Sequence, residues 1–128
     1  MIFCGFIIAE CPLKEDTKAV ITELKDASHE VKMITGDNAL TAAFIGQELT
    51  FGNGPSLFAH DGHSDNKLTW FDLDDKKVAV TTSSKEVAEL AKKNMLCING
   101  DVLSSVILYS ECSAIIRHID IFSRTSPA

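Results

Sequence analysis

The sequence has 128 residues, 45% of them hydrophobic and 23% charged, so it is one globular domain's worth of chain and neither disordered nor fibrous. Its net charge is −6 and its 12 lysines and arginines are scattered, which argues against nucleic acid or an anionic membrane as the main partner. The four cysteines form no Cys-x-x-Cys pair and lack histidines at zinc spacing, so we expect reduced thiols in a domain that faces the cytosol.

The first fifty residues predict a βαβα unit with two parallel strands. Residues 2–9 are almost continuously apolar, which predicts a strand buried on both faces of a sheet; a membrane span needs about 20 such residues. An amphipathic helix over residues 16–28 is expected to place its apolar stripe in the core. The stripe of this helix consists of Val20, Leu24 and Ala27. A second strand is expected over 31–34 and a second helix over 38–49, and they complete the unit.

The pattern changes over residues 51–82, where short apolar runs alternate with polar turns. These runs, at 57–59, 68–71 and 78–80, predict a small antiparallel or irregular insertion. Residues 83–128 then predict helix, strand, helix and strand, with a short extra helix before the last strand. The predicted fold class is α/β: a Rossmann-like three-layer sandwich with a parallel sheet, carrying a small antiparallel insertion.

The most informative motif is Met-Ile-Thr-Gly-Asp-Asn at residues 33–38, where a strand ends and a helix begins. Gly36 lets the backbone turn sharply and approach a ligand, and the first helical amides point their positive dipole at that place. Thr35 adds a hydroxyl donor, and Asp37 either caps the helix or orders water and a cation. The motif predicts a phosphoryl-binding turn, although such a turn by itself also connects a strand to a helix without binding anything.

Three other segments carry chemically capable side chains, and each has a plainer explanation that we favour. Asp72 resembles the first residue of an Asp-x-Asp phosphatase nucleophile, but an acidic turn is favoured. Residues 99–101, Asn-Gly-Asp, are favoured as a strand-to-helix turn capped by Asp101 over a magnesium motif. Residues 60–63, His-Asp-Gly-His, are favoured as a solvent loop over a metal site. We therefore predict no metal ligands in this chain.

Three short motifs follow one another along the chain: Cys-Pro-Leu-Lys at 11–14, the motif at 33–38, and Phe-Ser-Arg-Thr-Ser-Pro at 122–127. In this order they resemble motifs of the phosphorylation (P) domain of P-type ATPases, which has the haloacid-dehalogenase-like fold, and the resemblance implies that the sandwich is incomplete in this sequence. The last departs at two positions from the usual Phe-Ala-Arg-Val-x-Pro. The first, together with Leu-Cys at 96–97 ahead of Asn-Gly-Asp, looks most similar to the type V branch and its endoplasmic-reticulum subgroup.

The resemblance implies roles for individual residues and implies ATP and Mg²⁺ as ligands. Thr35 would hydrogen-bond the transferring phosphoryl group, with Gly36 forming the turn. Asp37 would position the nucleotide phosphates and the magnesium water shell. Arg124 would reach the nucleotide near its ribose. Lys14 either contacts the phosphate region or is an ordinary charge at a helix start, and the residues leave these two alternatives open.

The resemblance also implies partners outside this sequence. The family's nucleophile motif, Asp-Lys-Thr-Gly-Thr, occurs nowhere here, so we expect it before Met1, on a strand next to Met33 and Met95. The magnesium motif Gly-Asp-Gly-x-Asn-Asp is expected after Ala128. The segment would then work with the rest of the P domain and with the nucleotide-binding, actuator and membrane domains. It would lie on the cytosolic face of the endoplasmic reticulum, without touching the membrane or nucleic acid.

The implied function is that of one part of an ATPase that couples ATP hydrolysis, through an aspartyl-phosphate, to membrane transport or transmembrane-helix dislocation. The 128 residues alone are expected to be inactive. The alternative is a non-catalytic α/β module from a truncated gene product that binds nucleotide or a partner. A weaker third hypothesis is a phosphatase that uses Asp72.

Overall fold

The computed structural model describes residues 2–8, 12–61 and 67–125, and within them six strands form one mixed sheet. Their order across the sheet is β1-β6-β5-β2-β3-β4, parallel from β1 to β2 and antiparallel from β2 to β4. The predicted α/β fold with a mostly parallel sheet is therefore confirmed. The strands are β1 (Met33–Ile34), β2 (Ser56–Asp61), β3 (Leu68–Phe71), β4 (Lys77–Thr81), β5 (Met95–Asn99) and β6 (Ile121–Ser123).

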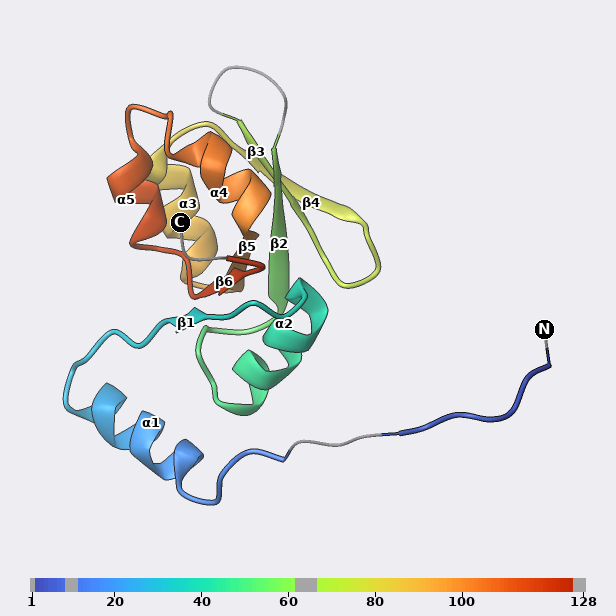
Figure 1. Ribbon diagram of the computed structural model, residues 1–128. Helices are drawn as coiled ribbons and strands as arrows, with labels where there is room; N and C mark the ends of the chain where they lie inside the picture. The colour runs from blue at the N-terminus through green and yellow to red at the C-terminus, as the bar shows by residue number, and fades with distance from the viewer. Residues whose placement is uncertain (1, 9–11, 62–66, 126–128) are drawn as a thin grey trace.

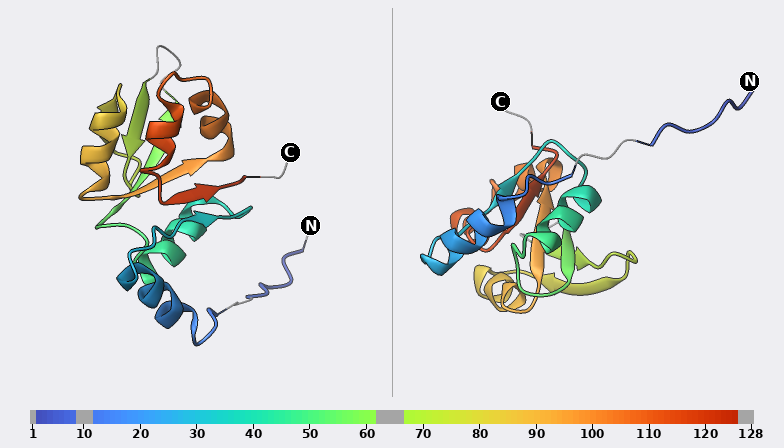
Figure 2. Two further views of the ribbon diagram at one scale, coloured as in Figure 1. Left: turned by 90° about the vertical axis from the view of Figure 1, so that its left-hand side faces the viewer. Right: turned by 90° about the horizontal axis from the view of Figure 1, so that it is seen from below.

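Helices cover both faces of this sheet and give three layers (Figure 1). One face carries α3 (Ser84–Ala91), α4 (Gly100–Val106) and α5 (Cys112–Ile116), and the other carries α2 (Ala39–Glu48). The first helix, α1 (Thr17–Asp26), stands apart from the sheet, as the views in Figure 2 also show. No helix in the described ranges is both long enough and apolar enough to cross a bilayer.

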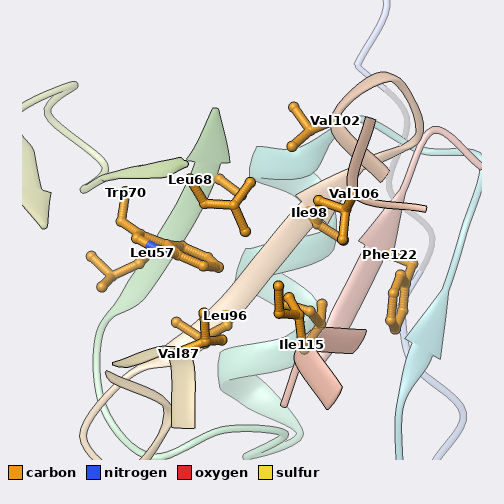
Figure 3. Close-up of a cluster of buried hydrophobic side chains, with 12 residues drawn as sticks. Leu57, Leu68, Trp70, Val87, Leu96, Ile98, Val102, Val106, Ile115 and Phe122 are labelled. Atoms are coloured by element: carbon orange, nitrogen blue, oxygen red, sulfur yellow. The ribbon is translucent and has the colours of Figure 1, made fainter. Parts of the chain in front are cut away.

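The larger core cluster lies between the sheet and helices α3, α4 and α5 (Figure 3). Trp70 is fully buried there, and its indole Nε1–H donates to the Thr81 hydroxyl at 2.9 Å. The cluster consists of Leu57, Ala59, Leu68, Trp70, Val87, Leu96, Ile98, Val102, Val106, Ile115, Ile119 and Phe122. A smaller cluster packs α2 on the opposite face and consists of Ala42, Ala43, Phe58, Met95, Cys97 and Ile121.

Strand β5 lies inside the sheet, between β6 and β2. Its successive side chains point alternately into the two core clusters. Leu96 and Ile98 enter the larger cluster, whereas Met95 and Cys97 enter the smaller one. This is the continuous apolar pattern of a strand that is buried on both faces. Burial, with the charge of Asp120 as a second cause, raises the pKa of the Cys97 thiol to about 12, so that it stays protonated.

Strand β2 links the antiparallel section to the main sheet. It pairs antiparallel with β3, where Phe58 lies opposite Phe71, and parallel with β5, where Ser56 lies opposite Met95. The short strands that the sequence predicts over residues 51–82 all form. The first of them, β2, is also a strand of the parallel part of the sheet, because it pairs with β5. The antiparallel section is thus a continuation of the sheet on the side of β2.

The predicted strand over residues 2–9 is wrong for the described residues 2–8, and Ala9 lies outside the described part. Residues 2–8 form no strand, and their large apolar side chains are exposed, Ile7 almost completely. A strand needs a neighbour that completes its backbone hydrogen bonds. Within the described ranges β1 pairs with β6 alone, and residues 2–8 do not occupy its other edge.

The predicted burial of the α1 stripe is also wrong. The helix forms over nearly the expected residues, but none of them is buried, and Val20, Leu24 and Ala27 are all exposed. A helix stabilises its apolar face only by covering another element. With the outer edge of β1 open among the described residues, α1 has no strand beneath it to cover.

Asp120, immediately before β6, joins three strands at their amino-terminal ends. Its carbonyl oxygen accepts the Met33 N–H at 2.9 Å, which fixes β1 against β6. Its own N–H donates to the Leu96 carbonyl at 3.0 Å, and its carboxylate accepts the Leu96 N–H at 2.9 Å. Burial raises the pKa of this half-buried carboxyl, although the hydrogen bond from Leu96 and the nearby Lys32 and Lys25 lower it.

We expect Asp120→Asn to be at least as stable as the parent chain at pH 7 and to show a flatter pH dependence. Because the folded-state pKa is raised, the stability that this carboxyl contributes is fully present below its ordinary value of 3.8 and is lost as the pH rises through the folded-state pKa. Asparagine still accepts the Leu96 N–H but never becomes charged. Urea unfolding between pH 4 and pH 7 measures both effects.

The control for this experiment is Asp120→Ala, which leaves the Leu96 N–H without its acceptor. It should lose about 1–3 kcal/mol of unfolding free energy at both ends of the pH range. An asparagine variant that lost as much stability at pH 7 as the alanine variant would show that burial does not penalise the charged carboxylate.

We also expect the isolated chain to self-associate through the open edge of β1. Ile34 is 73% exposed there, and an unpaired apolar strand edge is a template for pairing with another chain. Ile34→Lys should therefore shift the chain toward monomer in sedimentation velocity over a concentration series. Leu73→Lys is the matched control, because Leu73 is also 58% exposed but lies in the β3–β4 turn. A parent chain that stays monomeric at all concentrations and melts sharply would refute the expectation.

Candidate functional site

The Thr-Gly-Asp turn begins immediately after β1 and is closed by its own side chains. The Thr35 hydroxyl oxygen accepts the Asp37 N–H at 3.1 Å, and the same hydroxyl donates to the Asp37 carboxylate at 3.0 Å. Gly36 lies between them with open space where a Cβ would be, because no atom comes within 4 Å of that position. Packing within the described chain therefore does not require glycine at 36, and its absent side chain leaves the turn accessible to a ligand.

Asn38, and not Asp37, caps the helix that follows the turn. The Asn38 side-chain oxygen accepts the Thr41 N–H at 2.9 Å. The sequence-based alternative in which Asp37 caps α2 is therefore wrong. The Asp37 carboxylate instead holds the Thr35 hydroxyl and is exposed to solvent.

The carboxyl end of β6 brings Arg124 to this turn. Thr35 N–H donates to the Phe122 carbonyl at 2.9 Å, which continues the pairing of β1 with β6. Beyond the strand, Arg124 N–H donates to the Asp37 carbonyl at 3.1 Å. Thr125 donates to the Thr35 carbonyl twice, from its N–H at 3.3 Å and its hydroxyl at 3.4 Å. Two motifs about ninety residues apart in the sequence therefore meet at one end of the sheet.

Lys14 is not brought to this place. It precedes α1, its side chain is exposed, and its carbonyl oxygen accepts the Thr17 N–H at 3.1 Å. Within the described ranges, no hydrogen bond or ion pair joins its ammonium to Thr35, Asp37 or Arg124. The structure therefore places three of the four candidate contact residues together and leaves Lys14 apart; Cys11, Ser126 and Pro127 of the flanking motifs lie outside the described residues.

The acidic stretch that begins at Asp72 is a turn between β3 and β4. The Asp72 carboxylate accepts the backbone N–H groups of Asp74 at 3.0 Å and Lys76 at 2.9 Å. Lys76 also forms a solvent-exposed ion pair with Asp74 at 3.9 Å. The carboxylate that a phosphatase would need as its nucleophile is thus engaged in ordering a turn, as the plainer explanation predicts.

The other two candidate segments also have structural roles. Asn99 caps α4 by accepting the Val102 N–H at 2.9 Å, so the prediction that Asp101 is the cap is wrong by two residues. The His60 ring packs on Phe71 with 4.7 Å between the ring centroids. His63 lies outside the described residues. Among the residues that the structure does describe, no three His, Cys, Asp or Glu side chains gather as a metal site would require.

Sequence reasoning missed two residues that shape the end of β6. Gly100, the first residue of α4, lies against the Arg124 carbonyl, and Thr125 bonds to the turn through its hydroxyl. Thr125 stands where the usual Phe-Ala-Arg-Val-x-Pro motif has valine. This departure from the motif could have drawn attention to its hydroxyl. The other, Ser123, is buried and donates to the Ile98 carbonyl at 3.4 Å.

The assembled site offers a small set of groups at the carboxyl ends of two neighbouring parallel strands. It contains one hydroxyl on Thr35, one exposed carboxylate on Asp37 and one exposed guanidinium on Arg124. Ligands of α/β proteins bind at this end of the strands. A hydroxyl donor and an arginine on neighbouring backbone segments suit an anionic ligand, and a single carboxylate is too few ligands to hold a metal ion by itself.

Comparison with known proteins gives whole-chain matches to large ATPases. The chain is 34% identical over 125 residues to the probable manganese-transporting ATPase PDR2 of Arabidopsis thaliana, covering 98% of this chain and 10% of that protein. It is 35% identical over 130 residues to the endoplasmic reticulum transmembrane helix translocase of Schizosaccharomyces pombe, covering 100% and 11%. The corresponding translocase of Saccharomyces cerevisiae is 31% identical over 131 residues, covering 98% and 11%.

No protein-family model matches the sequence. The chain spans about a tenth of the length of the curated relatives that it matches along its whole length. The order of its motifs, its fold and these alignments all indicate the same family. The chain is thus a homologue of one segment of the type V P-type ATPases, a family that includes endoplasmic-reticulum transmembrane helix translocases.

Proposed function

We propose that this chain is the part of a P domain that contacts the transferring phosphoryl group and the nucleotide in a type V P-type ATPase. The observation that supports this most directly is the meeting of the Thr35–Asp37 turn with Arg124, through the Arg124 N–H···O=C Asp37 bond of 3.1 Å. This backbone bond brings the residue that the resemblance assigns to the nucleotide next to the two residues that it assigns to the phosphoryl group. Phosphoryl transfer is catalysed mainly by positioning and by charge neutralisation, which such a site supplies.

Thr35 has the central role in this proposal. Its hydroxyl hydrogen points at the Asp37 carboxylate, and rotation about the C–O bond redirects that hydrogen to a phosphoryl oxygen without moving the backbone. Asp37 N–H holds the hydroxyl oxygen in place during this rotation. Asp37 then positions water around the phosphates, and Arg124 contacts the nucleotide.

ATP is the proposed substrate, and Mg²⁺ bound to it would neutralise charge on its phosphates. Magnesium commonly keeps several waters and takes one or two protein carboxylates together with substrate phosphates. The exposed Asp37 carboxylate suits a contact with that water shell. The remaining ligands and the nucleophilic aspartate would come from other parts of the complete ATPase.

The open edge of β1 is the proposed place for the strand that carries the nucleophile. Met33 and Ile34 pair with β6 on one side, and no described strand pairs with them on the other. A strand added there would end beside Thr35. The expectation that this strand also adjoins Met95 is wrong, because β5 is already flanked by β6 and β2. Such a strand would also give α1 a surface to cover.

The complete protein is proposed to lie in the endoplasmic-reticulum membrane with this segment on its cytosolic face, as the names of two similar proteins indicate for themselves. It would couple ATP hydrolysis to transport or to transmembrane-helix dislocation. Its partners would be the rest of the P domain and the nucleotide-binding, actuator and membrane domains.

Sequencing the full messenger RNA tests whether the chain belongs to such an enzyme. A reading frame that continues upstream into Asp-Lys-Thr-Gly-Thr and downstream into Gly-Asp-Gly-x-Asn-Asp is expected. Stop codons on both sides without these motifs would instead favour the alternative, a non-catalytic module that keeps the phosphate-binding turn.

Within the complete ATPase, we expect Thr35→Ala to slow phosphoryl transfer by about a hundredfold. A donor aimed at developing negative charge is typically worth about 3 kcal/mol in the transition state. Formation and decay of the phosphoenzyme from radiolabelled ATP measure the effect.

Thr35→Ser is the matched control, since it keeps the hydroxyl and therefore most of the rate. Unchanged phosphoenzyme formation and decay in Thr35→Ala would mean that Thr35 is only a turn residue. Equal losses in the alanine and serine variants would point to the methyl group and to packing.

A further inference from the structure

Gly100 allows the chain beyond β6 to pass directly over the start of α4. A Cβ at position 100 would lie 2.5 Å from the Arg124 carbonyl oxygen and 3.4 Å from its carbonyl carbon. Real Cβ atoms do not approach other atoms to 2.5 Å. The obstacle is backbone and not the flexible end of a side chain, so no rotamer change relieves it. Any larger residue at 100 must displace the peptide that follows Arg124.

Arg124 itself has a backbone conformation that side-chain-bearing residues rarely adopt. Its φ is +47°, in the left-handed region, where the Cβ of an L-residue is crowded by the backbone. Such conformations persist only where the surroundings over-determine them, and they gather at functional sites. The surroundings constrain both peptide groups of the residue. The Arg124 N–H is held by the Asp37 carbonyl, and the Arg124 carbonyl lies against the place that a Cβ of residue 100 would take.

We propose that Gly100 is a positioning residue of the nucleotide site, and this inference rests on the function proposed above. By admitting the Arg124 carbonyl, Gly100 keeps Arg124 in its left-handed conformation and so fixes the direction in which the exposed guanidinium leaves the backbone. The two hydrogen bonds from Thr125 to the Thr35 carbonyl hold the next residue against the same turn. The arginine and the phosphoryl turn are thereby kept as one unit.

The first test compares Gly100→Ala, Arg124→Ala and the double variant in the complete ATPase that contains this chain. Phosphoenzyme formation over a range of ATP concentrations gives a KM and a maximal rate. Arg124→Ala should raise the KM about tenfold or more, as loss of a charge-assisted hydrogen bond does. Gly100→Ala should raise the KM several-fold with little change in the maximal rate, and it should add nothing in the Arg124→Ala background.

Gly52→Ala is the matched control for a purely structural effect. A Cβ at position 52 would lie 2.5 Å from the Met95 Cα, which is also a backbone atom, but at the amino-terminal end of β5. This variant should lower the melting temperature as Gly100→Ala does while leaving the KM for ATP unchanged. A KM that rose equally in both glycine variants would overturn the inference.

A second pair of variants serves if Gly100→Ala does not fold. Arg124→Gly removes the crowding of a left-handed residue, whereas Arg124→Ala keeps it. The glycine variant should melt a few degrees higher than the alanine variant and bind ATP no better. Equal melting temperatures would mean that Arg124 is not held in the left-handed conformation, which overturns the inference.

The outcomes separate this inference from the function on which it rests. An unchanged KM in Arg124→Ala would remove the proposed nucleotide contact and the role of Gly100 with it. A raised KM in Arg124→Ala together with an unchanged KM in Gly100→Ala would overturn the role of Gly100 alone. Additive effects in the double variant would do the same, because Gly100 would then act independently of Arg124.

Discussion

The pairing of β6 with β1 on one side and β5 on the other is the interaction on which the candidate site depends. The Met33 and Thr35 N–H groups donate to the carbonyls of Asp120 and Phe122, and Asn99 lies opposite Ser123 on the other side. Among the described strands, only β6 contacts β1 in the sheet. The place of β1, and of the turn that follows it, in the sheet is therefore set by pairing with one short strand. The same strand carries Arg124 at its end, so one pairing places both parts of the site.

Burial is distributed unevenly around this strand. On the face of α3, α4 and α5, buried residues form a continuous cluster that includes Trp70, whose indole N–H donates to the Thr81 hydroxyl. On the opposite face α2 covers a smaller cluster, and no residue of α1 is buried. The site thus lies on the border between a densely packed sheet and a thinly covered edge. Segments with few buried contacts are the first to open in native proteins. A strand added at β1 would cover the exposed edge and make burial more even across the sheet. The proposed function includes such a strand, so the exposed edge supports it.

The turn itself is organised before any ligand arrives. Thr35 and Asp37 bond to each other twice, and Asn38 takes over the capping of α2, which leaves the Asp37 carboxylate in solvent. Preorganised donors stabilise developing charge better than donors that must first be assembled. On the other strand, the left-handed Arg124 is held by contacts from two directions. The left-handed backbone of Arg124 limits the directions open to its guanidinium, and the hydrogen bonds of Thr35 hold its hydroxyl in place.

Much of the fold was predictable because helices and strands have different hydrophobic periods. The α2 segment forms close to its expected bounds, the helices and strands expected over residues 83–128 form in the expected order, and the short strands over 57–80 pair as expected. Caps were the less reliable part, since Asn38 and Asn99 cap helices for which neighbouring aspartates were considered. An aspartate and an asparagine one or two positions apart offer similar acceptors, and only the local backbone decides which of them reaches the free amide.

By itself the sequence determined most of the elements, and its motif at residues 33–38 predicted a phosphoryl-binding turn formed by Thr35, Gly36 and Asp37. The tertiary structure alone decided which of these elements meet. It joined Arg124 to the turn, kept Lys14 away, left residues 2–8 and the stripe of α1 uncovered, and set Gly100 against the Arg124 carbonyl. The reason is that periodicity and capping are properties of neighbours along the chain. The pairing of strands and the close approach of two backbones depend on residues far apart in sequence, whose positions only the packed fold defines.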